Sequence, residues 1–394
     1  MTVLDKNIKQ ETTHKELCVI GIARVLAALN VDIVTNVPGS GSENILANYN
    51  LITGNEQPIS FHEEVAFTIA HSGAILGKRS ACLIKSHGLV KAGNSVMDAM
   101  SCGTNAGMVS FILSDKLGSH SDNIFDVEPF MDGLQLPFFR LKKENIFSSI
   151  KNAYEFSELW KLPVAILVDD KILNEEVSYT CINDGFKPVK YERNIFQNLV
   201  CPVFGKFQFN VLESKLNRID WNSNVPPKPP LIDGNLPEAW QPTIKTYKPV
   251  FEYFKNIRGS LVCGDTGISS LFAFEPYSCV DITTYMGGSL PLAIGGYLAG
   301  HKDSWAISGD FAFISTGYLG LIEAKMRNIP LKVMIFKNDI AQTTGGQPIS
   351  PDLLNIQLAG FENYCTYTKI DNKLEATLEK AHNSTEMQII IIEC

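Results

Sequence analysis

Short apolar runs, separated by longer segments with helical spacing of apolar residues, dominate the first 180 residues. The runs are DIVTNV (32–37), ACLIKS (81–86), GMVSFILS (107–114) and LPVAILV (162–168). Runs of this length with few alternating polar positions are typical of parallel strands that are covered on both faces. Their alternation with helical segments predicts an α/β domain.

The same pattern returns after residue 243. The later runs are SLVCGD (260–265), SWAISGD (304–310), LKVMIFKND (331–339) and MQIIIIEC (387–394). The chain between the two sets has poor periodicity, and its proline-rich part, 222–242, favours an extended and semi-rigid conformation. We therefore predict one domain at 1–180, an interdomain linker at 181–242 and a second domain at 243–394.

Composition narrows the classes of partner. The 394 residues are 45% hydrophobic and carry a net charge of -8, and no basic tract with interleaved aromatic residues occurs. These features favour a globular protein with a small-molecule ligand over binding to nucleic acid or to an anionic membrane. The polar N-terminus has no apolar core typical of a signal peptide, and no apolar run approaches the roughly 20 residues of a membrane span. We expect a cytoplasmic protein.

The nine cysteines are scattered along the chain, and none forms a Cys-x-x-Cys pair. The usual local spacing of ligands for a zinc site or an iron–sulfur cluster is therefore missing. Reduced and mostly buried thiols are expected in this compartment.

Two polar residues follow neighbouring apolar runs in the second domain. Asp310 ends the run that begins at 304, and Asn338 ends the run that begins at 331, with helical spacing between the two. Ligands of open parallel sheets bind beyond the carboxyl ends of the strands, where both side chains would converge if the strands are neighbours. Their oxygens suit Mg²⁺. The alternative is that Asp310 only caps the following helix and Asn338 lies in a turn.

A second group of polar residues lies in the first domain. Glu63 stands where an apolar run passes into a helical pattern, and His87 and His120 lie in polar, glycine-containing loops after apolar runs. A functional carboxylate with two histidines at one rim is one interpretation. The alternative is that Glu63 interacts with the helix dipole and that each histidine is a hydrogen-bonded turn residue.

The chain resembles thiamine-diphosphate-dependent enzymes that act on 2-oxo acids. The segment TTGGQP (343–348) is similar to phosphonopyruvate and sulfopyruvate decarboxylases. The segments 59–89, 117–123 and 309–324 are similar to the large subunit of indolepyruvate ferredoxin oxidoreductase. The resemblance implies two thiamine-diphosphate-binding domains, a pyrimidine-binding domain first and a diphosphate-binding domain second, each a mostly parallel sheet flanked by helices.

The resemblance also implies roles for individual residues. Asp310, Asn338 and the backbone carbonyl of Ile340 correspond to the ligands of Mg²⁺, and Met286 corresponds to the apolar residue that holds thiamine diphosphate in its bent form. The other positions implied in binding this cofactor are Glu63, Gly264, Asp265, Thr266, Gly309 and Phe311. Gly-Asp-Phe replaces the usual Gly-Asp-Gly, and Lys337 stands before the asparagine where these decarboxylases commonly have Asp or Asn.

The implied role of Glu63 has a physical basis. A carboxylate that is hydrogen-bonded to a ring nitrogen of the pyrimidine stabilises the tautomer that removes the proton from C2 of the thiazolium. The resulting carbanion attacks the 2-oxo acid, and an enamine remains after decarboxylation. We hypothesise that His87 and His120 transfer protons or bind the substrate carboxylate, and that Gln342 and Gln347 line the same pocket.

Several reactions fit this machinery. Non-oxidative decarboxylation of a 2-oxo acid to an aldehyde needs only the cofactor, Mg²⁺ and a proton donor. Carboligation to a hydroxy ketone uses the same residues, and a ferredoxin oxidoreductase subunit ranks third because clustered cysteines are missing. A scaffold without activity is the non-enzymatic alternative. A bulky apolar substrate is slightly favoured over one with a phosphonate or sulfonate, which Lys85, His87 and Lys91 would suit.

The resemblance finally implies a homo-oligomer. In this family the pyrimidine-binding domain of one subunit faces the diphosphate-binding domain of another. Glu63 and Asp310 of one active site are therefore expected to come from different chains, so that a homodimer is the minimum active unit and a tetramer is compatible with it.

Overall fold

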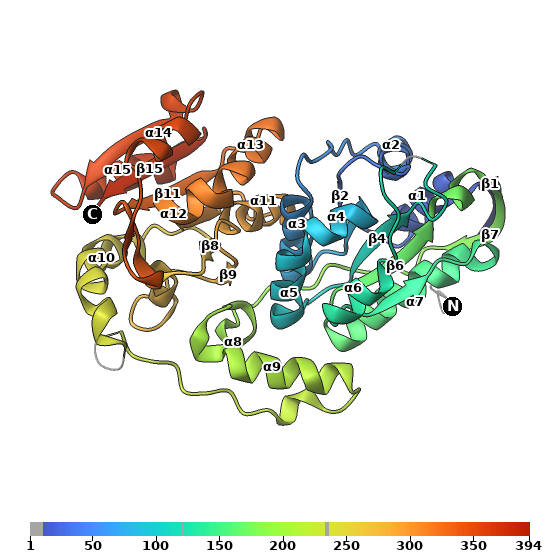
Figure 1. Cartoon of the computed structure of the whole chain (residues 1–394), viewed down its shortest axis with the longest axis horizontal. Coiled ribbons are helices and arrows are strands. Elements are labelled where there is room, and N and C mark those ends of the chain that lie inside the picture. Colours follow the sequence, from blue (N-terminus) through green and yellow to red (C-terminus); the bar gives the residue numbers. More distant parts are fainter. Residues whose placement is uncertain (1–10, 120, 233–235) are drawn as a thin grey trace, which may run out of the picture.

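The computed structural model describes residues 11–119, 121–232 and 236–394. It contains two fully parallel sheets flanked by helices, which confirms the predicted α/β class (Figure 1). The first sheet has the order β2 (Ile33–Asn36), β3 (Ser80–Lys85), β4 (Met108–Ser114), β6 (Val164–Asp169), β5 (Phe138–Arg140). The second has the order β14 (Cys365–Lys369), β15 (Gln388–Glu393), β11 (Lys332–Lys337), β10 (Trp305–Gly309), β8 (Val262–Asp265), β9 (Ile282–Thr284).

The helices lie between and outside these sheets. Those of the first half are α1 (Cys18–Ala28), α2 (Ser42–Thr53), α3 (Glu63–Ile75), α4 (Ser86–Lys91), α5 (Gly93–Cys102), α6 (Glu128–Gly133) and α7 (Ile146–Trp160). The rest are α8 (Ile195–Asn198), α9 (Pro202–Leu216), α10 (Gln241–Phe254), α11 (Ser289–Ala299), α12 (Asp310–Ala312), α13 (Tyr318–Met326), α14 (Asp352–Gln357) and α15 (Leu374–Asn383). Each of the eight apolar runs contains most of a strand, as predicted.

The strands that the pattern did not predict are short or polar. β5, β9 and β14 lie at or next to sheet edges. β1 (Glu11–Leu17) and β7 (Glu176–Ile182) form a separate antiparallel pair, and β12 (Ile340–Ala341) pairs with β13 (Gln347–Pro348) in a small hairpin. The sequence of β1, ETTHKEL, has no apolar face, so it carries no hydrophobic signal of a strand.

Helices α3 and α11 pack against each other between the two sheets (Figure 1). A Cβ atom at Gly295 would lie 2.5 Å from the backbone oxygen of Ile69, so only glycine allows this close approach. One apolar cluster includes Val65 and Ile69 from α3 together with Leu290 and Ala293 from α11. The two halves of the chain therefore share part of their hydrophobic core.

Buried polar contacts also join the halves. The hydroxyl oxygens of Thr68 and Tyr285 are 2.9 Å apart. Ser60 donates a 2.6 Å hydrogen bond to Glu323, whose carboxylate also pairs with Arg327 at 2.7 Å. Because these side chains are shielded from water, their pairing fixes how α3 and its preceding loop sit against the second half.

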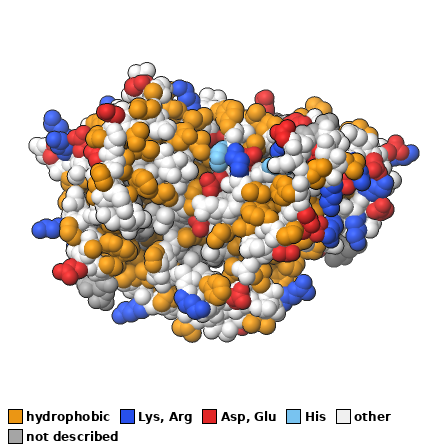
Figure 2. Space-filling model, in the orientation of Figure 1, with side chains coloured by type: hydrophobic (Ala, Val, Ile, Leu, Met, Phe, Trp, Pro, Cys, Tyr) orange, Lys and Arg blue, Asp and Glu red, His pale blue; other side chains and the backbone are white. Residues whose placement is uncertain are grey.

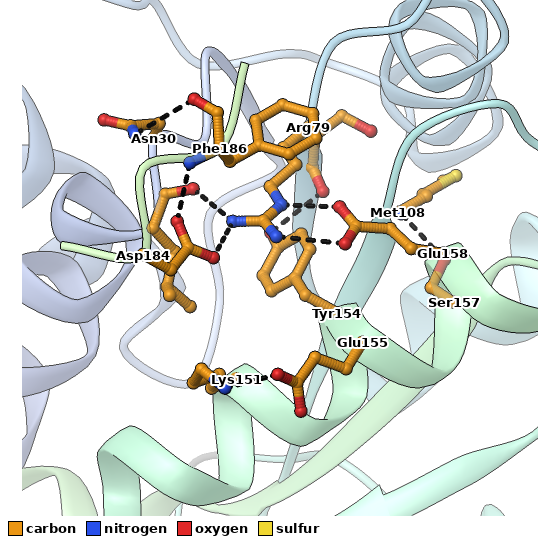
Figure 3. A network of polar contacts seen from close by, with 12 residues as sticks. Asn30, Arg79, Met108, Lys151, Tyr154, Glu155, Ser157, Glu158, Asp184 and Phe186 are labelled. Carbon is orange, nitrogen blue, oxygen red and sulfur yellow. Dashed lines mark hydrogen bonds and ion pairs between the residues drawn. The ribbon is translucent and has the colours of Figure 1, made fainter. Parts of the chain in front are cut away.

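Arg79 attaches the start of the predicted linker to the first half (Figure 3). Its guanidinium pairs with Glu158 and Asp184, each at 2.6 Å, and lies 4.1 Å from the centroid of the Phe186 ring. Further along the predicted linker, Arg193 pairs with Asp281 of the second half of the chain at 2.9 Å. Helices α8 and α9 follow, so the region 181–242 contains packed helices as well as extended chain. The domain limits themselves stay predictions.

Apolar side chains are exposed over much of the face seen in Figure 2, and charged side chains gather most densely at the end that holds β1 and β7 in Figure 1. Exposed apolar residues of the whole surface include Phe61, Val90, Met97 and Phe311. In the part of the chain that the structure describes, no helix combines the length and apolar character needed to cross a membrane.

Candidate functional site

A cavity opens at the point where the connections of the second sheet change direction. The chain passes from β8 to β9 on one side of β8, and later to β10 on the other side of β8. Such switch points are the usual ligand sites of open parallel sheets. Residues after β8, Thr266–Ser269, and residues after β10, 309–312, line the cavity together with Met286, Asn338 and Ile340.

Asp310 is one of the two buried carboxylates that line this cavity; the other is Asp265. Asp310 begins the helical segment that continues through a π-helical turn, η6 (Phe313–Gly317), into α13. Its Oδ1 accepts the N–H of Phe311 at 2.7 Å, and its Oδ2 accepts the N–H groups of Asn338 and Asp339 at 2.9 and 2.7 Å. Burial raises the pKa of Asp310, and these three hydrogen bonds oppose the rise. A carboxylate has about four acceptor positions, so one remains for a ligand.

The turn after β11 presents the second predicted ligand. Asn338 is adjacent to Asp310 because β10 and β11 are parallel neighbours, with Gly309 opposite Phe336. Its Oδ1 accepts the N–H of Ile340 at 3.2 Å, and its Nδ2 lies 3.5 Å from the hydroxyl of Tyr247. A second lone pair of Oδ1 stays available.

The next residue, Asp339, has a left-handed φ of 54°, a conformation that aspartate tolerates better than most residues. Lys337 pairs with its carboxylate at 2.6 Å. Lys337 is therefore bound within the turn. This ion pair and the bond from the Asp339 N–H to Asp310 hold the turn in place.

Asp265 and Met286 also line the cavity. Asp265 accepts hydrogen bonds from the N–H of Ser289 at 2.7 Å and from the hydroxyl of Ser308 at 2.5 Å, and burial raises its pKa to about 6. It ties α11 and β10 to the end of β8. The backbone oxygen of Met286 accepts a 2.6 Å hydrogen bond from Thr316 in the π-helical turn, which fixes the backbone of Met286 beside Asp310.

Glu63 begins α3, in the other half of the chain. Its Oε2 is 2.7 Å from Nζ of Lys91 on α4, but the two groups are not aligned as a hydrogen bond. Among the described residues this buried oxygen has no hydrogen-bond partner. A Cβ atom at Gly88 would lie 2.7 Å from Cγ of Glu63, so the helix α4 passes directly against the glutamate. Glu63 is thus a buried carboxylate with an open acceptor.

The histidine candidates divide. His87 lies on the same helix as Lys91 and four residues before it, so both lie near the same side of α4. Its ring nitrogen contacts the amide oxygen of Asn123, and its ring meets Phe125 edge-on at 4.9 Å. His120 lies outside the described residues. Another histidine, His62, directly precedes Glu63, and burial together with Lys91 lowers its pKa.

Of the two glutamines predicted to line the pocket, Gln342 lines the cavity of Asp310. Gln347 is exposed and makes a 2.8 Å hydrogen bond to the backbone oxygen of Thr344 within the β12–β13 hairpin. All residues that line this cavity lie between 247 and 344. The structure therefore brings Asp310, Asn338, Ile340, Met286 and Asp265 together within one chain, whereas Glu63 and His87 form a separate group.

The residues present fit a magnesium ion and a diphosphate. Asp310 and Asn338 each keep a free oxygen lone pair on one edge of the cavity, and a site that Mg²⁺ completes with phosphate and water needs few protein ligands. In the described ranges no group of three or more His, Cys, Asp or Glu side chains could hold a metal ion. Gly267–Ser269 also line the cavity and supply backbone N–H groups of the kind that bind phosphate, and Thr266 and Ser269 supply hydroxyls.

Comparison with known families now assigns this half of the chain. Residues 265–392 match the family described as thiamine pyrophosphate enzyme, C-terminal TPP binding domain. Residues 265–392 therefore belong to a thiamine-pyrophosphate-binding (TPP-binding) domain. The matched residues include Asp265, Asp310 and Asn338, so all of the cavity lining except Tyr247 lies within the matched segment.

Relatives and solved structures agree with this assignment. The chain is 25% identical over 205 residues to indolepyruvate oxidoreductase subunit IorA of Methanothermobacter marburgensis, and 28% identical over 217 residues to the subunit of the same name in Methanothermobacter thermautotrophicus. Each match covers 50% of this chain but only 33% and 35% of the relatives. The fold matches that of a Mycobacterium smegmatis protein described as a thiamin diphosphate-dependent enzyme, with a TM-score of 0.64, 15% identity and coverage of 96% and 99% of the two chains.

Sequence reasoning missed Tyr247, which lines the TPP-binding cavity, and the contact between Lys91 and Glu63. Tyr247 comes from α10, about 90 residues before Asn338, and stacks on Phe336 with ring centroids 4.1 Å apart. Lys91 was considered only as a substrate contact, but it pairs with Glu63. Both contacts join residues of different helices or strands, so they become apparent only from the packing of the structure.

Proposed function

We propose that the protein is a Mg²⁺- and thiamine-diphosphate-dependent enzyme that decarboxylates a 2-oxo acid to an aldehyde without oxidation. The observation that carries this proposal is the arrangement of Asp310. Three backbone N–H groups fix this buried carboxylate at the switch point of a TPP-binding domain, beside the amide of Asn338. Such an arrangement suits one divalent cation and a diphosphate.

The residues would divide the work of binding. Asp310, Asn338 and the carbonyl of Ile340 would hold Mg²⁺, and Thr266–Ser269 would contact the diphosphate. Met286, whose backbone is fixed by Thr316, would support the organic part of the cofactor. Bound thiamine diphosphate supplies an electron sink for the cleavage of a carbon–carbon bond next to a carbonyl group.

Glu63 would control a proton. Its Oε2, which has no hydrogen-bond partner among the described residues, would accept a hydrogen bond from a protonated nitrogen of the pyrimidine ring of thiamine diphosphate and so stabilise the proton on that nitrogen. Lys91 is 53% exposed in its side chain, so its ammonium can turn toward water when a ligand takes its place. His87 stands on the same helix and remains our candidate for proton transfer to the product or for contact with the substrate carboxylate. We retain His120 as its proposed partner.

We also propose that the active unit is at least a homodimer. The cavity of Asp310 is lined from one half of the chain, and Glu63 lies in the other half, so a second subunit can bring Glu63 over the cavity. Exposed apolar side chains flank both groups: Phe61 at 59% and Val90 at 46% lie near Glu63, and Phe311 at 40% is next to Asp310. Exposed apolar side chains beside polar functional groups are typical of surfaces that bind a partner.

Two other reactions use the same residues. A carboligase would join the bound fragment to a second carbonyl compound and would need no further side chain. An oxidoreductase subunit is suggested by the names of the two Methanothermobacter relatives, but the chain spans only about a third of their length. Its dispersed cysteines also lack the spacing of a cluster site, so we rank this reaction third.

Product analysis tests the proposal. The protein would be incubated with thiamine diphosphate, Mg²⁺ and a panel of 2-oxo acids that includes indolepyruvate, phenylpyruvate, phosphonopyruvate and sulfopyruvate, with and without an added aldehyde. An aldehyde that disappears with Glu63→Gln supports the decarboxylase. A longer hydroxy ketone supports the carboligase. Failure of the protein to bind thiamine diphosphate in a Mg²⁺-dependent way would contradict the whole proposal and favour a scaffold.

A further inference from the structure

A second cavity, of about 250 Å³, lies where α5 meets the helices of the linker. Its walls come from the end of α5, from Lys161 after α7, from α8 and α9, and from the short turn η3 (Trp221–Ser223). It shares no lining residue with the cavity of Asp310. Neither the sequence motifs nor the proposed function uses it.

Lys215 is the unusual residue of this cavity. It lies on α9 and is only 6% exposed, although buried lysines are rare unless they are paired. Its Nζ donates a 3.1 Å hydrogen bond to the backbone oxygen of Lys161. An ammonium group has three donors, and among the described residues this is the one bond that it makes. The cavity lining contains no Asp or Glu.

The surroundings explain how the fold tolerates this charge. Helix α5 ends at Cys102 and α7 ends at Trp160, so the negative ends of two helix dipoles face Lys215. This compensation is partial, because a second cation, Lys161, lines the same cavity and its Nζ donates to the backbone oxygen of Asn105 at 2.9 Å. The cavity therefore carries two positive charges and no negative side chain.

The remaining walls suit a flat organic group. Phe196, Phe207 and Trp221 line the cavity, and Nζ of Lys215 is 5.8 Å from the centroid of the Trp221 ring. Gln197 also lines it, and its buried Nε2 has no hydrogen-bond partner among the described residues. An unpaired buried donor beside two ammonium groups indicates a missing acceptor.

We propose that this cavity binds a small aromatic anion, whose carboxylate or phosphate accepts hydrogen bonds from Lys215 and Gln197 and whose ring packs against Trp221. The observations behind it are the unfilled donors of Lys215 and of the Gln197 amide nitrogen, and the absence of a carboxylate from the lining. The ligand would contact α5 and α9 together, and so would join the first half of the chain to the linker.

The electrostatics of Lys215 agree with this proposal. Burial and the charge of Lys161 lower the pKa of Lys215 to about 8, against the opposite influence of Cys102. Burial itself keeps the Cys102 thiol neutral, because it raises the pKa of that group far above its usual range. A bound anion would favour the ammonium form, so affinity should fall as the pH rises through about 8.

Calorimetry with three probes tests the proposal: phenyl phosphate, inorganic phosphate and benzyl alcohol. Each titration would be repeated with Asp310→Ala and without Mg²⁺, so that binding of phosphate at the cavity of Asp310 is recognised by its dependence on that residue. We expect phenyl phosphate to bind more tightly than either of the other probes, and to change the tryptophan fluorescence because Trp221 lines the cavity.

Lys215→Met provides the decisive variant, since methionine keeps much of the side-chain volume without the charge. It should weaken the binding of phenyl phosphate by about 10- to 100-fold, as expected for the loss of a hydrogen bond to a charged group. Lys206→Met, an exposed lysine on the same helix, is the matched control and should leave the affinity unchanged. Absence of saturable binding at millimolar phenyl phosphate, or equal affinity in Lys215→Met and the native protein, would overturn the proposal. Equal affinities for phenyl phosphate and inorganic phosphate would overturn the assignment of an aromatic ligand.

Discussion

The carboxylate of Asp310 holds the backbone N–H of Asn338 by a 2.9 Å hydrogen bond, across 28 residues of sequence. The two residues meet because β10 and β11 are adjacent and parallel, and each strand ends at the same edge of the sheet. Asp310 therefore has a structural role in the turn as well as the role of a ligand that we propose. The role of a ligand depends on its negative charge, whereas the turn requires only acceptor oxygens.

Asp310→Asn should separate these roles. The amide cannot accept hydrogen bonds through its nitrogen, and it lacks the charge that Mg²⁺ requires, so we expect at least a 100-fold loss in the affinity for thiamine diphosphate, measured by calorimetry in the presence of Mg²⁺. The melting temperature should fall only modestly. Asp339→Asn removes the partner of Lys337 on the exposed side of the same turn, and it should retain most of the affinity. Similar losses in both variants would indicate a collapsed turn and not a lost ligand.

The meeting of Asp310 and Asn338 could be predicted from the sequence, because it requires only two neighbouring apolar strands and their direction. The partners of these residues could not. Tyr247 contacts Asn338 because α10 packs beside β11. Lys337 pairs with Asp339 within a turn in which Asp339 is left-handed. Neither arrangement produces a periodic pattern of apolar residues in the sequence. The sequence left open whether Asp310 caps the following helix or binds a metal ion. In the structure its carboxylate accepts hydrogen bonds both at the start of the helix, from Phe311, and in the turn after β11, from Asp339.

Glu63→Gln should lose activity while keeping the cofactor. The amide has nearly the same shape but no negative charge to stabilise a protonated ring nitrogen, so the rate should fall by about 100-fold or more. The affinity for thiamine diphosphate should change by less than about tenfold, because Mg²⁺ and the diphosphate provide most of the binding. Steady-state rates and calorimetry would be measured on the same preparation. Full activity in Glu63→Gln would remove this residue from the mechanism.

Mixing two inactive variants tests whether subunits share active sites. If Glu63 of one chain serves the cavity of Asp310 in its partner, a heterodimer of Glu63→Gln and Asp310→Ala has one intact site and one site that lacks both residues. Random exchange of subunits should then restore about a quarter of the native activity. If both residues of a site came from one chain, every site would lack one of them, and the mixture would stay inactive. Light scattering of each variant alone provides the control for assembly.

The contact of Glu323 and Arg327 predicts a loss of stability without a direct effect on chemistry. Both side chains are almost fully buried, and Ser60 from the first half completes their hydrogen bonds. Arg327→Met would leave the Glu323 carboxylate buried without its cation, so the free energy of unfolding should fall by about 3 to 5 kcal/mol in urea titrations. Lys151→Met breaks an exposed pair with Glu155 and should cost less than about 1 kcal/mol. Equal effects would mean that burial does not govern these pairs.

The linker shows where pattern analysis fails for a physical reason. Helix α9 buries Gln208 and Lys215 along with Phe204 and Leu212, so its inward face is partly polar and has no clear apolar stripe. Gln208 is there because its amide donates to the backbone oxygens of Phe196, Gln197 and Leu199 at the end of α8. Lys215 has no comparable set of acceptors among the described residues, so a bound ligand would explain why this lysine is buried.

Lys215 also predicts how stability depends on pH in the absence of any ligand. Its pKa falls from 10.5 to about 8 on folding, so between these values the unfolded chain binds more protons than the native protein. The free energy of unfolding therefore gains a contribution that rises with pH from about 8 to 10.5, and below pH 8 the buried charge costs about 3 kcal/mol. Lys215→Met should accordingly be more stable than the native protein at pH 7, with a difference that shrinks as the pH approaches 10. Urea denaturation at several pH values measures this difference, and Lys206→Met should show no such trend. A difference that grows with pH would mean that a bound anion or an acidic partner already compensates the charge of Lys215.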